Sequence, residues 1–209
     1  MDTQIAFFLW IGDDAATPGG IRNVSISNVR ATTERGCYFG GSRTIPIENV
    51  RLSEIDLTVR GKMDDKFAEV VPYPYHVFDY WGKWTGIPHA IYCRHVRGMD
   101  MSQVRVRWGD VSGQWRSALR CEQVEDIGIN GFVARQAPGS NASVVHLTDT
   151  SGAFVHGCRA ESGTGTFLRV DGAKSRRISV IGNDLAEAAT PMEDAGGVRK
   201  GTMAGSNDG

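Results

Sequence analysis

Several features that mark other classes of protein are absent from this sequence of 209 residues. Its most apolar stretch, residues 5–11, is far shorter than the roughly 20 residues that a membrane-spanning helix needs. Acidic Asp2 precedes this stretch, whereas a signal peptide begins with basic residues. Positive and negative side chains nearly balance, with 23 lysines and arginines and 24 aspartates and glutamates. We therefore expect no membrane segment and no nucleic-acid partner, and the sequence does not indicate a compartment.

An amphipathic helix pattern is missing as well, and a repeat of strand-like segments stands in its place. The clearest copy is IENVRLSEIDLT, residues 47–58. Further copies start at residues 21, 96, 124 and 150, and a weaker copy starts at residue 175. Successive starts are 26, 49, 28, 26 and 25 residues apart, so only the second interval breaks the rhythm.

Each copy alternates apolar and polar residues, slips its phase by one residue and then alternates again, which predicts a strand, a corner and a second strand. Asparagine and glycine recur at the slip and tolerate the left-handed backbone of a sharp bend. The predicted corner residues are Asn28, Glu54, Gln103, Gly131, Gly157 and Gly182. A third apolar stretch precedes most copies and is clearest at residues 90–93, 118–121, 144–147 and 167–170.

Three short strands in a period of 25–28 residues predict an all-β fold, a parallel β-helix of about six coils over residues 1–185. An antiparallel sandwich also has many short strands, but it does not require a repeat that keeps its phase. Residues 186–209 are rich in glycine and lack the period. We expect them to form a disordered tail that docks at most at its start.

The long interval contains an insertion within residues 61–88 that is rich in aromatic residues and proline. This segment either folds back over the solenoid as packing or forms one wall of a cleft where sugar rings stack on aromatic faces. The second alternative predicts a set of substrate-binding residues: Tyr75, His76, Asp79, Tyr80, Trp81 and Trp84.

The first residues already resemble the third strand of a coil, so the chain begins in mid-coil with no cap before it. An uncapped coil exposes strand edges and core. We therefore expect further coils upstream of Met1 in the natural protein, and an exposed N-terminal coil through which the chain can self-associate.

The four cysteines are Cys37, Cys93, Cys121 and Cys158. Cys93 and Cys121 hold equivalent positions in neighbouring repeats, and side chains stacked in parallel register seldom meet the torsion of a disulfide. No Cys/His spacing is typical of a metal site. We therefore expect free thiols, no metal and no cofactor.

The remaining polar candidates are arginines and histidines. One set of arginines could line a single face and bind uronate carboxylates, or it could be a solvated face balanced by acidic residues: Arg94, Arg97, Arg105, Arg107, Arg116 and Arg120. The histidines are scattered along the chain, and we expect His146 and His156, which fall on predicted strands, to be structural.

Residues 40–61, 89–108 and 117–135 resemble the later coils of family 28 of the glycoside hydrolases, the polygalacturonase-like family, and are most similar to its bacterial members. The resemblance covers about residues 5–185. It implies a right-handed single-stranded parallel β-helix that hydrolyses pectin-type polysaccharide by an inverting mechanism. In that mechanism two carboxyl groups roughly 6.5–9.5 Å apart act as acid and base.

The family's catalytic motifs, Asn-Thr-Asp, Asp-Asp, Gly-His-Gly and Arg-Ile-Lys, are not found here with their flanking residues. The pairs Asp13–Asp14 and Asp64–Asp65 fall in predicted loops, so we assign no catalytic residue. The motifs precede these coils in the family, and we expect the catalytic half to lie upstream. Three hypotheses follow: the C-terminal part of a pectin hydrolase, a non-catalytic polysaccharide-binding β-helix, and a structural or adhesive solenoid.

Overall fold

The structure, a computed structural model, describes residues 2–11, 19–63, 87–194 and 203–204, and in these residues it is all-β. The strands are β1 (Asp2–Thr3), β2 (Phe8–Trp10), β3 (Arg22–Thr33), β4 (Cys37–Gly40), β5 (Ile47–Met63), β6 (Ile91–Gly113), β7 (Leu119–Asn130), β8 (Val133–Ala134), β9 (Val145–Thr148), β10 (Ser151–His156), β11 (Arg159–Ala160), β12 (Thr164–Asp171), β13 (Arg176–Ile181), β14 (Ala188–Asp194) and β15 (Met203–Ala204).

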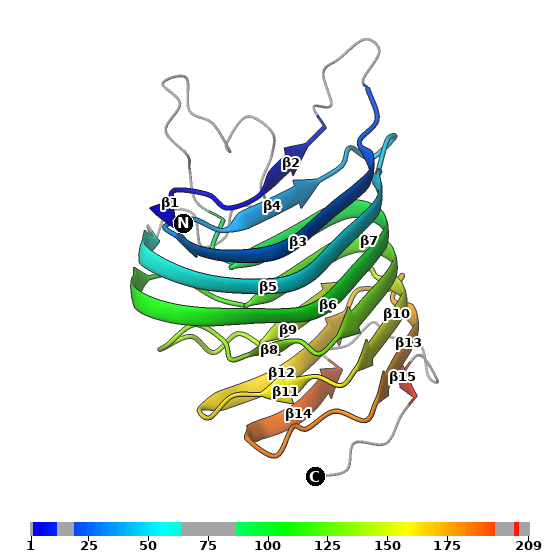
Figure 1. Cartoon of the computed structure of the whole chain (residues 1–209). Helices are drawn as coiled ribbons and strands as arrows, with labels where there is room; N and C mark the ends of the chain where they lie inside the picture. The colour runs from blue at the N-terminus through cyan, green and yellow to red at the C-terminus, as the bar shows by residue number, and fades with distance from the viewer. Residues whose placement is uncertain (1, 12–18, 64–86, 195–202, 205–209) are drawn as a thin grey trace.

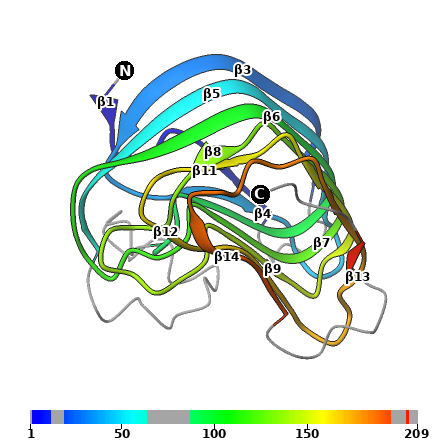
Figure 2. The ribbon, with the colours of Figure 1, turned by 90° about the horizontal axis from the view of Figure 1, so that it is seen from below.

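These strands stack in parallel as a β-solenoid of about six turns, which confirms the predicted fold class. Figure 1 shows the coils from the side, with β3, β5 and β6 one above the other. Figure 2 looks along the stack and shows the chain winding around one cross-section. Adjacent coils therefore lie one strand spacing apart, about 4.8 Å.

The coils present three faces. The first follows the path β3-β5-β6-β7-β10-β13, and the third follows β2-β4-β6-β7-β9-β12-β14. The second is made by the later parts of β3, β5 and β6 and by the short strands β8 and β11. On the first face the register joins equivalent repeat positions, since Val50 pairs with Met99 and Ile127 pairs with Ala153. The repeat period read from the sequence is therefore the length of one coil.

The predicted corners are where the backbone turns left-handed. All six predicted corner residues have a positive φ, between 53° at Gln103 and 66° at Gly131. Glu54 and Gln103 adopt this conformation although neither is glycine or asparagine, which shows that coil stacking overrides the local preference. A second column of left-handed residues lies near the start of each repeat and was not predicted: Asn23, Asn49, Gly98, Asp126, Gly152 and Arg177.

The core fills the inside of the coils with one apolar side chain above another. Phe39, Phe132 and Phe167 are fully buried, and the inward pairs of the repeat are buried from Val50 onward. Cys93 lies opposite Cys121 in the register, and all four cysteines are free and buried, as expected. Burial raises the pKa of the Cys37 thiol to about 12, so this thiol stays protonated and packs as an apolar group.

Two predicted boundaries need correction. Gly61 and its two successors, assigned to the insertion, continue β5 and pair with the end of β6. The predicted tail begins too early, because β14 pairs with β12 along five positions from Ala188 to Asp194 and extends the third face by one coil. The backbone of β12 supplies hydrogen-bond partners to this segment, and the polar sequence of the segment alone does not reveal them. The rest of the insertion, residues 64–86, lies outside the described residues.

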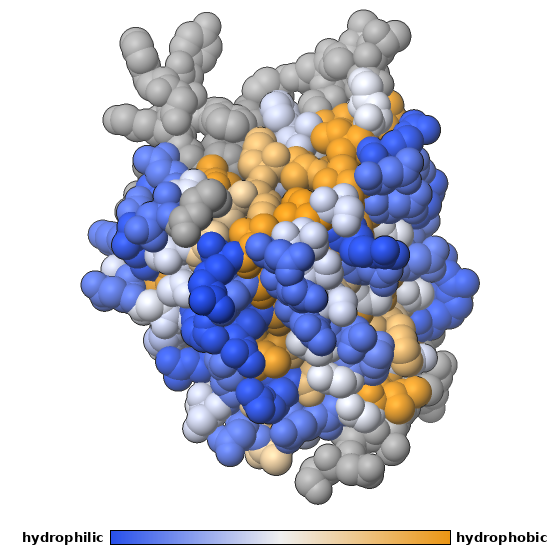
Figure 3. Space-filling view, viewed as in Figure 1, coloured by the Kyte–Doolittle hydropathy of each residue, from blue (hydrophilic) through white to orange (hydrophobic). Residues whose placement is uncertain are grey.

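At the N-terminal end, β3 pairs on its outer side with β1 at Thr32 and Thr33. Within the described chain no other strand covers that edge. Figure 3 shows hydrophobic surface gathered in the upper part of the view, where Figure 1 places β2 and β4. Self-association through this end stays a prediction, and both observations favour it.

Candidate functional site

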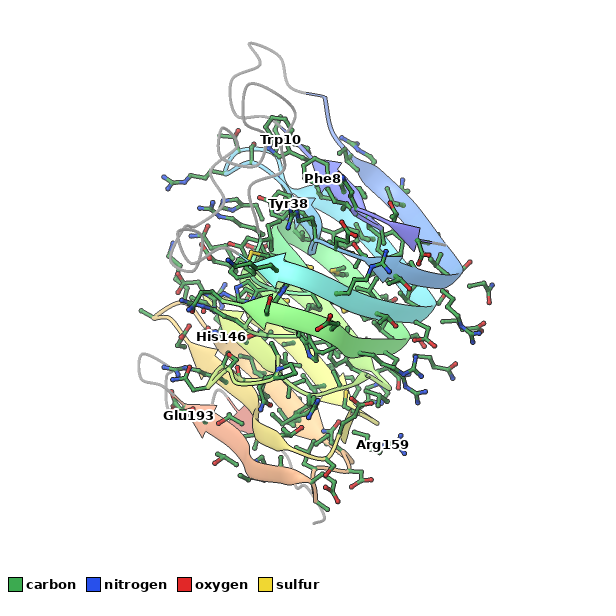
Figure 4. All side chains as sticks on the ribbon, turned by 90° about the vertical axis from the view of Figure 1, so that its left-hand side faces the viewer. Phe8, Trp10, Tyr38, His146, Arg159 and Glu193 are labelled. Atoms are coloured by element: carbon green, nitrogen blue, oxygen red, sulfur yellow. The ribbon has the colours of Figure 1, made fainter. Side chains whose placement is uncertain are left out.

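The third face carries a continuous outward column of aromatic and then charged side chains. The register pairs Phe8 with Tyr38, Tyr38 with Tyr92, Tyr92 with Arg120, Arg120 with His146, His146 with Arg169, and Arg169 with Glu193. Figure 4 shows Phe8, Tyr38, His146 and Glu193 along one side of the stack, with Arg159 on the opposite side. Because each coil adds one member, neighbouring side chains stand about 4.8 Å apart.

The lower part of this column forms the floor of a hollow of about 830 Å³, which we call the basic groove. Two segments between strands form its walls, residues 113–117 and 138–143. Its titratable lining residues are His89, Tyr92, Arg116, Arg120, Glu122, His146 and Arg169. A volume of this size is typical of a site for a small ligand or a few sugar units.

The wall at residues 113–117 is fixed by buried contacts. The indole of Trp115 is 3% exposed, and its Nε1 donates to the Gly61 carbonyl at 2.9 Å. The Arg116 N–H donates to the Pro88 carbonyl, and the Arg116 carbonyl accepts from Ala137, each at 2.8 Å. The wall is therefore held on both sides before any ligand arrives, which lowers the entropic cost of binding.

Glu122 organises the positive charges on the floor. Its Oε2 accepts from the Tyr92 hydroxyl at 3.0 Å and lies 3.7 Å from Arg120 Nη2, while Oε1 lies 3.5 Å from Arg94 Nε. The side chains of Arg94 and Arg120 are only 12% and 16% exposed. Their charges are therefore poorly solvated and placed by a fixed partner, unlike those of surface arginines.

One coil further, His146 and Asp171 form a second polar pair. His146 Nε2 lies 2.7 Å from Asp171 Oδ2, and the Thr148 hydroxyl donates to Asp171 Oδ1. Arg169 Nε is 3.9 Å from the same carboxylate. Burial raises the pKa of Asp171, but hydrogen bonds from Thr148 and His146 outweigh it and leave that pKa below its usual range. Asp171 is therefore ionised at neutral pH and serves as a partner rather than an acid.

The two histidines of the groove are neutral at neutral pH. Burial lowers the pKa of His89 well below its usual value, and the positive charge of Arg120 lowers it further. His89 Nδ1 accepts from the Ser117 N–H at 3.3 Å, which requires that nitrogen to be unprotonated. Burial and Arg120 also lower the pKa of His146. The positive charge of the groove therefore comes from its arginines.

The balance of these charges is positive and incompletely matched. Among the described residues that line the groove, three arginines, Arg116, Arg120 and Arg169, face one carboxylate, Glu122, so positive charge is in excess there. Arg120 Nη1 is buried without a hydrogen-bond partner, as are the hydroxyls of Ser117 and Ser143 in the walls. Buried donors without partners cost free energy, and an anionic ligand with several oxygens would satisfy them.

The structure divides the predicted arginine set. Arg116 and Arg120 line the basic groove and Arg94 pairs with its Glu122, whereas Arg97 bridges Glu48 and Glu125 at 3.4 and 3.1 Å. Arg107 contacts Asp56 on another face. The single arginine face is therefore wrong, because these arginines lie on different strand segments of the coil, which its left-handed corners turn to different sides. The predicted binding residues Tyr75, His76, Asp79, Tyr80, Trp81 and Trp84 lie outside the described residues, as do both Asp-Asp pairs.

Sequence reasoning missed the roles of His89, His146 and Arg169. A signal was present for two of them, because the third residues of the aligned stretches 90–93, 118–121 and 144–147 are Tyr92, Arg120 and His146, and Arg169 continues the series. His89 lies before its strand and meets Ser117 only after the coils stack. No alignment of repeats within the chain reveals that contact.

Comparisons of this chain with models of protein families, with curated proteins and with solved structures found no match. In the part of the chain that the structure describes, no helix is long and apolar enough to span a membrane. The same part contains no group of three or more histidine, cysteine, aspartate or glutamate side chains that could hold a metal ion.

Proposed function

We propose that the basic groove binds the uronate units of an acidic, pectin-like polysaccharide, and that the chain is the C-terminal portion of a polygalacturonase-like glycoside hydrolase. The observation that carries this proposal is the buried Nη1 of Arg120, which has no hydrogen-bond partner and lies in a groove whose described lining has three arginines and one carboxylate. A guanidinium fork matches the two oxygens of a carboxylate, so a uronate satisfies the donor and the charge together.

Binding rather than cleavage is the expected activity of the isolated chain. The groove's carboxylates, Glu122 and Asp171, are each held by hydrogen bonds and ion pairs with neighbours. An inverting hydrolase needs one carboxyl group that is protonated and one that can take a proton from water. Asp171 has a lowered pKa and does not fit the acid role. Release of reducing ends from polygalacturonate by the purified chain would contradict this expectation.

The decisive experiment is calorimetric titration of the full chain with a galacturonate tetramer, comparing the natural protein with Arg120→Gln. We expect the substitution to weaken binding about 10–100-fold, since a charged hydrogen bond contributes about 1.5–3 kcal/mol. Arg107→Gln is the matched control, because Arg107 pairs with Asp56 on another face. Equal affinity of Arg120→Gln and the natural chain, with both folded, would refute the site.

The insertion remains the predicted second wall of such a cleft. Its proposed sugar contacts, Trp81 and Trp84 above all, precede Ile87 in the sequence, and Ile87 is buried against Tyr38 and Tyr92 of the same column. The non-catalytic polysaccharide-binding β-helix is the second candidate function, and the same titration supports it if the upstream coding sequence lacks the catalytic motifs.

A further inference from the structure

The first face carries a second hollow, of about 730 Å³, which we call the Phe154 groove. Strands β3, β5, β6, β7 and β10 line it, and within the described residues no loop raises a wall around it. The residues that the argument uses are Arg51, Asp100, Asp126, Gly128, Gly152 and Phe154. This groove lies on a different face from the basic groove and shares no lining residue with it.

Phe154 gives the groove an exposed aromatic surface. Its side chain is 43% exposed, which is unusual for a phenylalanine on a strand with an otherwise polar outer side. The ring lies against the His156 ring, with centroids 4.6 Å apart and an angle of 31° between the ring planes. In the register its neighbours on the adjacent coils are Gly128 and Ser179, which are too small to cover the ring. The ring is therefore fixed in place and open to a ligand.

Gly128 leaves room for a carboxylate beside that ring. Its φ lies outside the left-handed region, so the backbone there does not require glycine. A Cβ at this position would lie 2.8 Å from Asp100 Oδ1, which means that the carboxylate overhangs the position that a side chain would fill. Asp126 Oδ1 overhangs Gly152 in the same way, at 2.4 Å from the position of a Cβ there. Each carboxylate therefore occupies the space that a side chain on the glycine would fill, and the two form a shelf of acceptor oxygens next to an aromatic ring.

The negative charge of this shelf excludes a uronate, the ligand that we propose for the basic groove. Asp100 and Asp126 carry two negative charges, and among the described lining residues one positive charge, that of Arg51, lies 3.7 Å from Asp100 Oδ2, so negative charge is in excess. A uronate would be repelled here. A neutral pyranose suits the shelf, since its C–H face buries apolar area on the ring while its hydroxyls donate to the carboxylates.

We propose that the Phe154 groove is a binding site for neutral sugar units, separate from the uronate site. The ring of Phe154 stacks on one sugar, and Asp100 and Asp126 accept hydrogen bonds from its hydroxyls. A polysaccharide with an acidic backbone and neutral side branches would engage both grooves at once, which raises its apparent affinity without new contacts. The sugar site stands on its own observations and does not depend on the uronate proposal.

The test is calorimetric titration of the full chain with neutral tetrasaccharides derived from galactan, arabinan and xylan, at low and high salt. We expect at least one to bind with a millimolar Kd that does not change with salt. Phe154→Ala should weaken it at least tenfold, and Gly128→Val, which displaces the Asp100 carboxylate, should do the same. Ile181→Ala removes another exposed apolar side chain on the same face, 47% exposed, and should change nothing.

Arg120→Gln separates the two sites, because it should leave neutral binding intact whether or not uronates bind the basic groove. The inference is overturned if none of the neutral tetrasaccharides binds at millimolar concentration, or if Phe154→Ala binds them as the natural chain does. It is equally overturned if a protonated glucosamine tetramer binds while the neutral probes do not, since charge alone would then attract the ligand. Circular dichroism of each variant confirms that it is folded.

Discussion

The basic groove and the Phe154 groove are similar in size, about 830 and 730 Å³, but they are built in different ways. Segments between strands raise walls around the basic groove, and Arg120 on its floor is largely buried beside Glu122. The Phe154 groove has only strand residues, and its carboxylates and aromatic ring are exposed. One repeat can support both, because the apolar positions fix the coil while the outward positions are free to differ from face to face.

The largest expected effect comes from breaking the core that the two grooves share. Ile127 is 2% exposed beneath the Phe154 groove, and Ile127→Asp places an uncompensated charge between coils. We expect a loss of stability of about 4 kcal/mol or more, with unfolding of the solenoid and loss of both ligands.

Thermal unfolding followed by circular dichroism measures this loss, with Asp126→Asn as the adjacent exposed control. An unchanged melting temperature for Ile127→Asp would show that the inward face is assigned incorrectly. Loss of neutral-sugar binding alone would show that the coils of the two grooves unfold separately.

A change of pH should affect one groove and not the other. His89 and His146 have lowered pKa values and are neutral at pH 7 in the free protein. A bound uronate favours their protonation, so its affinity should rise as pH falls from about 7.5 to about 5.5, by roughly tenfold for each pKa unit that the ligand restores. Neutral-sugar binding, which involves neither histidine, should not change. Titrations in two buffers of different ionisation enthalpy would detect the proton uptake.

The same two histidines determine whether the free protein becomes more or less stable as the pH falls. Their folded-state pKa values lie below the unfolded value of about 6.5, so the unfolded chain binds more protons once the pH falls below that value. Stability contributed by the neutral rings is therefore complete above this pH and is lost progressively as the pH falls through it. An increase in stability on acidification would contradict the neutral state of the rings.

The smallest expected effect concerns the corners, which both grooves share. Gly182 has a φ of 58°, and no atom lies within 4 Å of the position that a Cβ would take, so Gly182→Ala tests backbone strain alone. We expect a loss of about 1 kcal/mol, the cost of a left-handed conformation for a residue with a Cβ. Glu54→Gly, at an equivalent corner, should lose little or gain. Denaturant unfolding of both variants would show whether the corners are strained as described.

The inward half of the structure could be predicted from the sequence, and the outward half could not. The six corners, the apolar pairs and the stacking of Cys93 on Cys121 follow from local alternation and from the period. The basic groove depends on pairs of residues about one coil apart, such as His89 with Ser117, and on walls whose sequences differ in every coil. The second column of left-handed residues was not predicted, because Asn49 and Asp126 are polar residues within otherwise regular strands.

The parallel register has a consequence for how such a protein can change over generations. Since each coil contacts its immediate neighbours, duplication of one coil adds a rung without disturbing those beyond it. Each new rung would lengthen both grooves by the same step, about 4.8 Å. The number of sugar units that the molecule accommodates is thereby open to adjustment by whole-coil insertion or deletion, with no redesign of the residues already in place.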